Sequence, residues 1–177
     1  MSVTTHPFDD DHLHEECAVF GIFNHPEASA HTALGLHALQ HRGQEAAGIV
    51  SFDEEQFHAH RDIGLVGDIF SSQAVMQRLP GTAAIGHTRY STTGEPMLRN
   101  VQPLFADLLG GGIACAHNGN LTNGIQLRRK LVKEGAIFQS TTDTEAFIHL
   151  IARSKENSII NRLGFNNKGV DYLVNNL

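Results

Sequence analysis

Short apolar runs separated by polar loops recur along the chain, and they predict where its strands lie. Runs of four to eight residues rich in Val, Ile, Phe and small side chains are typical of buried strands. Such runs occur at residues 17–23, 49–52, 57–61, 82–87 and 113–116.

Apolar residues at helical spacing, together with terminal signals, predict four helices. They span residues 26–41, 71–80, 126–134 and 146–153. Pro26 is suited to the first turn of the first helix, and Gly43 ends that helix. Ser71 is expected to cap the second helix. Thr142 and Glu145 have the spacing of a capping box at the start of the last one.

Two polar segments beside these elements are candidates for a site. The run Leu39–Gly48 is polar and small at its centre, which indicates either a site-forming turn or a solvated loop. Arg89 stands in a cluster of hydroxyl residues after a strand, and its guanidinium fork is suited to a carboxylate or a phosphate. In isolation, a structural ion pair with a nearby Glu is the simpler explanation of Arg89.

Two later features have both a structural and a chemical interpretation. Asn118-Gly119 is typical of a hairpin turn, and turn chemistry alone favours that interpretation. Alternatively, the Asn118 amide and the Gly119 N–H are two donors that can converge on a developing oxyanion. Asp143 lies at the start of the last predicted helix, where the helix dipole favours a carboxylate. It either stabilises the helix start, which is the simpler explanation, or receives a ligand's ammonium group.

Composition narrows the class of protein. Hydrophobic residues make up 41% of the 177 residues, so the chain is expected to fold as one domain with a core. A net charge of −6 gives no electrostatic basis for a nucleic-acid partner. No apolar run is long enough to span a membrane, so no membrane partner is expected. Two cysteines and no signal peptide indicate the cytoplasm.

Residues 1–16 are polar and contain five acidic side chains and three histidines, which predicts a disordered tail. His12 and His14 are an alternative metal pair, but two histidines without a third partner do not define a site, and no metal ligand is predicted. Cys17 follows this tail directly. A cut before Cys17 would place a thiol and a free α-amine, which titrates near pH ~8, on one residue. That pairing is a known route to covalent catalysis.

Five segments in one order resemble the glutaminase domain of the amidophosphoribosyltransferase family, a branch of the class II glutamine amidotransferases. They are Glu16-Cys17-Ala18-Val19-Phe20-Gly21, residues 39–48, Gly86-His87-Thr88-Arg89-Tyr90-Ser91-Thr92, residues 116–121 and Ser140-Thr141-Thr142-Asp143-Thr144-Glu145. The resemblance covers roughly residues 10–155. It implies the N-terminal-nucleophile hydrolase fold, an α+β structure with an αββα sandwich, here truncated before the sandwich is complete.

The resemblance also implies roles for individual residues. Cys17, freed from a propeptide at residues 1–16, would attack the side-chain amide of glutamine, and Asn118 and Gly119 would hold the oxyanion. The remaining expected substrate-binding residues are Arg89 and Thr92 for the α-carboxylate, Asp143 for the α-ammonium group and Arg42 near the nucleophile. Ala18 stands where the family usually carries Gly.

The family's full-length members carry a second domain, which transfers the ammonia to phosphoribosyl pyrophosphate with magnesium, and some hold an iron–sulfur cluster. No cofactor is expected in this chain itself, whereas homo-oligomers are expected of the full-length family. The domain is expected at residues 17–155, and residues 156–177 resemble a segment of dihydroorotate dehydrogenase. The alternative function is a non-catalytic, truncated or fused remnant that at most binds glutamine or a partner subunit.

Overall fold

The computed structural model describes residues 17–90, 97–108 and 111–154, and these form a sequence of short strands and helices. The strands are β1 (Ala18–Ile22), β2 (Ala46–Phe52), β3 (Phe57–Ile63), β4 (Ala83–Arg89), β5 (Leu104–Leu108) and β6 (Gly111–Cys115). The α-helices are α1 (Ala28–Ala38), α2 (Val66–Phe70), α3 (Gln73–Met76), α4 (Gly124–Lys133) and α5 (Thr144–Arg153). Two 3-10 turns, η1 (Gln40–Arg42) and η2 (Leu98–Asn100), complete the described elements.

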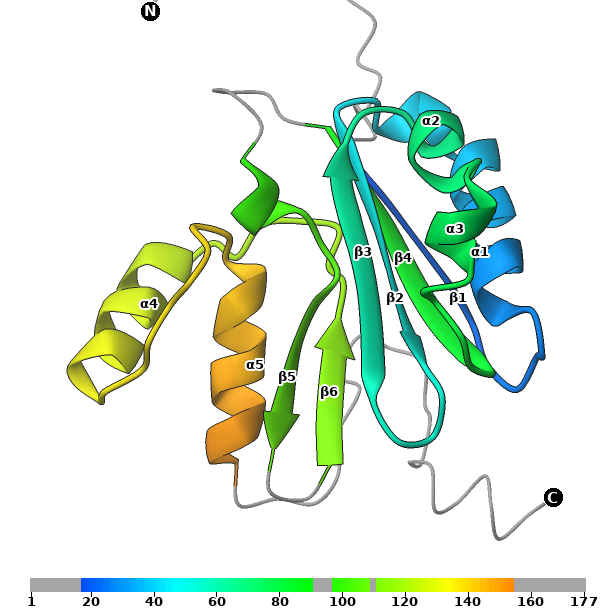
Figure 1. The fold of residues 1–177 in the computed structure, drawn as a ribbon. Coiled ribbons are helices and arrows are strands. Elements are labelled where there is room, and N and C mark those ends of the chain that lie inside the picture. Colours follow the sequence, from blue (N-terminus) through cyan, green and yellow to red (C-terminus); the bar gives the residue numbers. More distant parts are fainter. Residues whose placement is uncertain (1–16, 91–96, 109–110, 155–177) are drawn as a thin grey trace, which may run out of the picture.

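The strands form two antiparallel sheets. One sheet has the order β1-β4-β2-β3, and the other pairs β5 with β6. Figure 1 shows α1, α2 and α3 on one side of the four-stranded sheet, β5 and β6 beyond its other side, and α5 and α4 outermost. The order helix, sheet, sheet, helix agrees with the αββα arrangement expected from the resemblance.

The pleat of the four-stranded sheet decides which side chains can reach a site. Side chains alternate between the two faces of a strand. Ala47 and Ile49 of β2 belong to a buried cluster with residues of α1 and α2. Their neighbours in sequence, Gly48 and Val50, therefore face the second sheet, as do His87 and Arg89 of β4, which are paired with Gly48 and Ala46. The polar end of β4 thus faces the space between the sheets.

Helix α1 packs closely on this sheet because a glycine on each side of the contact makes room for side chains from the other. A Cβ built on Gly35 of α1 would come within 2.6 Å of the Phe20 ring of β1. One built on Gly86 of β4 would come within 2.6 Å of a Leu36 methyl group. Leu36 is fully buried as a result. This close packing fixes β1 and β4, the two strands beside Cys17, against a rigid layer.

The strand predictions were largely confirmed, but β5 was not predicted and two helix starts were wrong. Ser71 does not cap a helix that runs to Pro80, because its hydroxyl donates to the carbonyl of Asp68 at the end of α2 (3.3 Å). Within the predicted range 71–80 the structure has only the short helix α3, and α2 ends before Ser71.

The capping box at Thr142 was also wrong. Asp143 is the N-cap residue of α5 and makes no side-chain capping bond. The Glu145 carboxylate accepts instead from the backbone N–H groups of Gln139 and Ser140, at 2.7 Å each. Glu145 therefore shapes the loop before the helix and not its first turn.

Candidate active site

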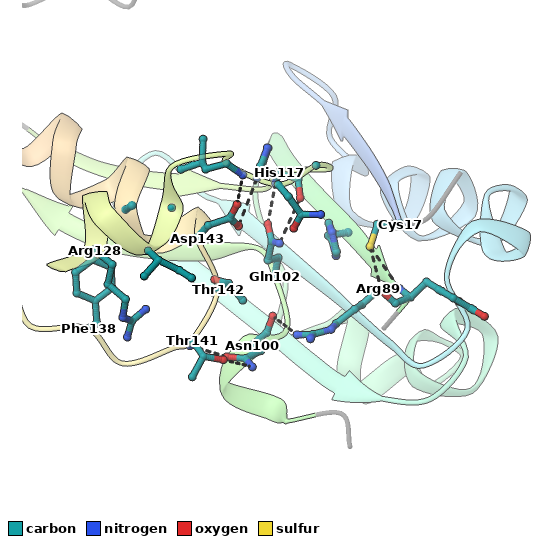
Figure 2. Close-up of a pocket in the computed structure, with 18 residues that line it drawn as sticks. Cys17, Arg89, Asn100, Gln102, His117, Arg128, Phe138, Thr141, Thr142 and Asp143 are labelled. Carbon is teal, nitrogen blue, oxygen red and sulfur yellow. Dashed lines mark hydrogen bonds and ion pairs between the residues drawn. The ribbon is translucent and has the colours of Figure 1, made fainter. Parts of the chain in front are cut away.

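A cleft of about 380 Å³ opens between the end of β4 and the loops that precede α4 and α5. Figure 2 shows the side chains that line it. Those drawn from the four-stranded sheet and the residues flanking it are Cys17, His87, Arg89 and Tyr90. Those from the other half are Asn100, Gln102, His117, Gly119, Asn120, Leu121, Gly124, Ile125, Arg128, Phe138, Thr141, Thr142, Asp143 and Ala146. The cleft therefore brings together segments that lie far apart in the sequence.

Cys17 stands immediately before β1 in a left-handed backbone conformation, with φ of +65°. This conformation is uncommon for a residue with a side chain and turns the thiol out of the line of the strand. The backbone N–H of Tyr90 donates to Sγ at 3.4 Å. A donor at the sulfur stabilises negative charge there, as a thiol nucleophile requires.

The backbone of Cys17 is held by two residues from separate loops. Its N–H donates to the carbonyl of Arg42 at 2.7 Å, and Arg42 Nε donates to the carbonyl of Cys17 at 3.1 Å. Asn118 Nδ2 donates to the same carbonyl at 3.2 Å. The 39–48 segment is therefore part of the site and not a solvated loop, because its Arg42 contacts the cysteine directly.

Arg89 lies at the end of β4 and reaches across the cleft. Its Nη1 donates to the carbonyl of Asn100 at 3.1 Å. Among the described residues it has no acidic partner, and Glu95, the Glu nearest to it in the sequence, lies outside them. A guanidinium has five N–H donors. Those not used on Asn100 remain available to an anionic group in the cleft.

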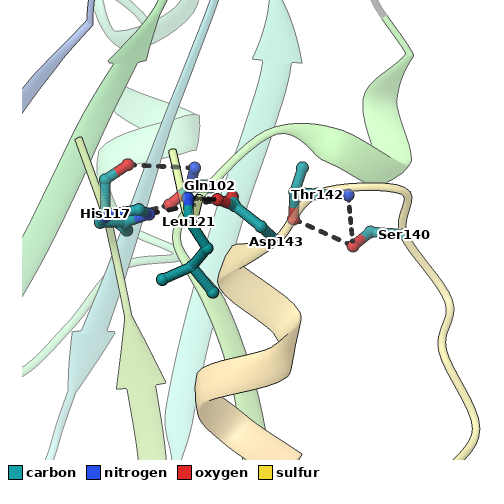
Figure 3. A network of polar contacts seen from close by, with 6 residues as sticks. All are labelled: Gln102, His117, Leu121, Ser140, Thr142 and Asp143. Atoms are coloured by element: carbon teal, nitrogen blue, oxygen red, sulfur yellow. Dashed lines mark hydrogen bonds and ion pairs between the residues drawn. The ribbon is translucent and has the colours of Figure 1, made fainter. Parts of the chain in front are cut away.

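The loop at residues 117–121 joins β6 to α4, so Asn118-Gly119 does not form the hairpin that turn chemistry favoured. Gly119 has φ of +139°, a conformation that residues with a Cβ rarely adopt. Asp143 Oδ2 accepts from the N–H of Leu121 at 2.6 Å, and its Oδ1 lies 3.9 Å from His117 Nδ1. Figure 3 shows these contacts between Asp143, Leu121 and His117. Asp143 therefore fixes the loop through Oδ2, and its carboxylate also lines the cleft.

Known proteins match this chain closely. The amidophosphoribosyltransferase of Rhizobium etli is 64% identical over 159 residues, which cover 90% of this chain and 32% of that protein. The amidophosphoribosyltransferase of Lacticaseibacillus casei is 51% identical over 147 residues, which cover 83% of this chain and 76% of that sequence. This chain belongs to the amidophosphoribosyltransferase family.

Sequence and structure agree on which domain of the family's proteins this chain corresponds to. The glutamine amidotransferase domain family matches residues 87–164. The structure resembles the solved glutamine phosphoribosylpyrophosphate amidotransferase of Bacillus subtilis with a TM-score of 0.71 at 47% identity. A second solved structure, of the allosteric regulatory enzyme of purine biosynthesis, gives a TM-score of 0.73 at 48% identity. Each match covers 78% of this chain and 30% of the solved chain. The chain is a glutamine amidotransferase domain of this family and spans about a third of the length of the Rhizobium etli relative.

The structure brings six of the seven site residues expected from the family resemblance to one place. Cys17, Arg89, Gly119 and Asp143 line the cleft, and Arg42 and Asn118 contact Cys17. Thr92 lies outside the described residues, as do the expected propeptide and the dihydroorotate dehydrogenase-like tail. Ala18 is buried, and alternation along β1 places its methyl group on the face that carries Phe20 and Ile22. Those two side chains pack against the core under α1, so this methyl group points away from the cleft.

Sequence reasoning missed several polar residues of the amidotransferase cleft. Asn100 and Gln102 are buried, at 3% and 8% exposure, in a segment with no recognisable pattern. His87 is 1% exposed, and burial lowers its pKa to about 4, with a further contribution from the nearby Arg89. His87 is therefore neutral at physiological pH. In the sequence, the one feature that could have indicated His87 is its position as a polar residue at the end of an otherwise apolar strand.

Within residues 17–90, 97–108 and 111–154, no three His, Cys, Asp or Glu side chains gather as a metal site requires. Within the same ranges no helix has the length and apolar character needed to cross a membrane.

Proposed function

We propose that this amidotransferase domain hydrolyses glutamine to glutamate and ammonia through a thioester on Cys17. The thiol sulfur attacks the side-chain carbonyl carbon of glutamine, and the tetrahedral intermediate collapses with loss of ammonia. Water then attacks the thioester and releases glutamate. The observation that supports this proposal is that Cys17, Arg89 and Asp143 line one cleft, with a nucleophile, a cation and an anion around it.

The charges in the cleft match those of the amino-acid end of glutamine. Arg89 binds the α-carboxylate, with help from Thr92, because a guanidinium fork matches a carboxylate in shape and charge. Asp143 receives the α-ammonium group with the oxygen that does not hold Leu121. Asn118 and the N–H of Gly119 stabilise the oxyanion, and each such donor is worth ~3 kcal/mol in comparable sites.

The base in this mechanism is the α-amine of Cys17, freed by removal of residues 1–16. It accepts the thiol proton and passes it to the leaving nitrogen. The carbonyl of Arg42, which accepts from the Cys17 nitrogen at 2.7 Å, supports this role because it orients that nitrogen. Nothing in the scheme requires a cofactor, and the chain's two cysteines are too few for an iron–sulfur cluster with four thiolates.

In the full-length protein we propose that the ammonia is transferred to phosphoribosyl pyrophosphate to give 5-phosphoribosylamine, with magnesium held by the transferase part, in a homo-oligomer. A cytoplasmic location is proposed because a reactive thiol needs a reducing compartment. The competing proposal is a non-catalytic remnant that binds glutamine or a partner subunit.

Ammonia release from glutamine by the purified protein, measured beside Cys17→Ala, tests the catalytic proposal. We expect release from the wild type alone, together with an intact mass that lacks residues 1–16. Equal release from both proteins would refute catalysis by Cys17. Glutamine binding without release would favour the non-catalytic remnant.

A further inference from the structure

Residues 100–102, here called the 100–102 segment, contact both halves of the cleft without belonging to a strand. On one side the segment is fixed to the four-stranded sheet. Arg61 Nη1 of β3 donates to the carbonyl of Val101 at 3.2 Å, and Arg89 of β4 donates to that of Asn100. The Gln102 carbonyl lies so close to Gly48 of β2 that a Cβ there would overlap it.

On its other side, Gln102 extends its side chain to the 117–121 loop. Gln102 Oε1 accepts from the N–H of His117 at 2.7 Å, and Gln102 Nε2 donates to the carbonyl of His117 at 3.3 Å. Both ends of one buried amide are therefore used on the backbone of a single residue, and Figure 3 shows this pair of bonds. A pair of bonds fixes both the position and the orientation of the His117 backbone.

His117 is the residue directly before Asn118 and Gly119, the two expected oxyanion donors. Its ring packs edge-on against Phe147 at 5.0 Å between centroids. Asp143 holds the other end of the loop at Leu121. The donors thus lie between two attachments, and the one at His117 leads directly, through Gln102, to the sheet that carries Cys17 at its edge. The attachment at Asp143 leads to the same segment less directly, because Thr141 is hydrogen-bonded to Asn100, and the Asn118 side chain itself contacts the Cys17 carbonyl.

We propose that Gln102 is a positioning residue, which sets the distance between the oxyanion donors of the 117–119 loop and the Cys17 thiol. The inference rests on the proposed glutaminase function. Its physical basis is that a donor stabilises a transition state only when it is already in place, and a displacement of about 1 Å can cost about 10²-fold in rate. Gln102 does not touch the substrate in this proposal.

Gln102→Met, which keeps the length of the side chain and removes both hydrogen bonds, tests the proposal in the full chain. We expect kcat to fall at least tenfold while KM for glutamine changes less than threefold, because the loop donors act on the transition state. The matched control is Ser29→Ala in α1, which removes a buried hydrogen bond to the Leu79 carbonyl (2.7 Å) on the side of the sheet away from the cleft. It is expected to lower the melting temperature without lowering kcat.

Amide hydrogen exchange gives a second measurement that does not depend on turnover. The N–H of His117 should exchange faster in Gln102→Met, with that of Cys115 unchanged. If kcat of Gln102→Met stays within twofold of the Ser29→Ala value, or if exchange at His117 is unaltered, Gln102 does not position the loop. If the wild type releases no ammonia, the proposed function fails and exchange at His117 alone decides whether Gln102 fixes the loop.

Discussion

The substitution Gly119→Ala, compared with a matched control, distinguishes backbone strain at Gly119 from the proposed role of its N–H as an oxyanion donor. Gly119 has φ of +139°, and a Cβ there would lie 3.1 Å from His117 Nε2. A residue with a Cβ in such a conformation costs roughly 1–3 kcal/mol. For a chain of this size a loss of about 2 kcal/mol lowers the melting temperature by about 4–8 °C. The close contact adds a second effect, because either the loop or the His117 ring has to move.

Gly64 provides a control with almost the same backbone conformation. Its φ is +135°, but a Cβ at that position meets nothing closer than Ile69 Cγ1 at 3.9 Å, and Gly64 lies outside the cleft. Gly64→Ala should therefore lose a similar amount of stability from backbone strain alone. Any further loss in Gly119→Ala reports the contact with His117 and the shift of the loop.

The assay is glutamine hydrolysis at a temperature well below both melting transitions. We expect kcat of Gly119→Ala to fall by about 10²-fold, equivalent to about 2.7 kcal/mol, and that of Gly64→Ala to match the wild type. Equal kcat values for the two variants would show that the Gly119 N–H does not act on the transition state, and the assignment of the oxyanion donors would be wrong.

Three further predictions concern charge and burial. Asp143→Asn should raise KM for glutamine by about 10–100-fold, since the ammonium group loses a charged partner, and a kinetic assay that finds an unchanged KM would remove Asp143 from the substrate site. Burial lowers the pKa of His87 from 6.5 to about 4, so the unfolded chain binds more protons than the folded one between these pH values. The contribution of neutral His87 to stability is therefore complete above pH 6.5 and is lost as the pH falls towards 4. Urea unfolding across this range should show a weaker pH dependence in His87→Gln than in the wild type, and parallel curves would contradict the assignment. Glu145→Ala should cost about 2–4 kcal/mol in urea unfolding, because it leaves the N–H groups of Gln139 and Ser140 and the Ser140 hydroxyl without their acceptor, whereas a loss below 0.5 kcal/mol would show that water replaces it.

The sequence alone was enough to predict the strands and helices that depend on local patterns of residues. Apolar runs located five strands, and the helix predicted at residues 126–134 corresponds to α4, which Gly135 follows with φ of +87°. The family segments identified six residues that gather at the cleft, because those segments are specific in residue type and order. Capping rules failed where a side chain bonded to the preceding segment and not to the first turn of the helix that follows it. Ser71 has the composition of a cap, and Glu145 the spacing of one, yet each is bound elsewhere.

Only the tertiary structure decided how the site is supported. Asn118-Gly119 is compatible with a hairpin until Gln102 and Asp143 hold the two ends of its loop. Asn100 and Gln102 carry no signal of their own, since a buried amide is costly anywhere that lacks partners and its partners here lie 15 and 41 residues away. Long-range hydrogen bonds of this kind depend on which segments the fold brings together. The sequence therefore determined which groups are present for the chemistry, and the packing of the two sheets determined where they stand.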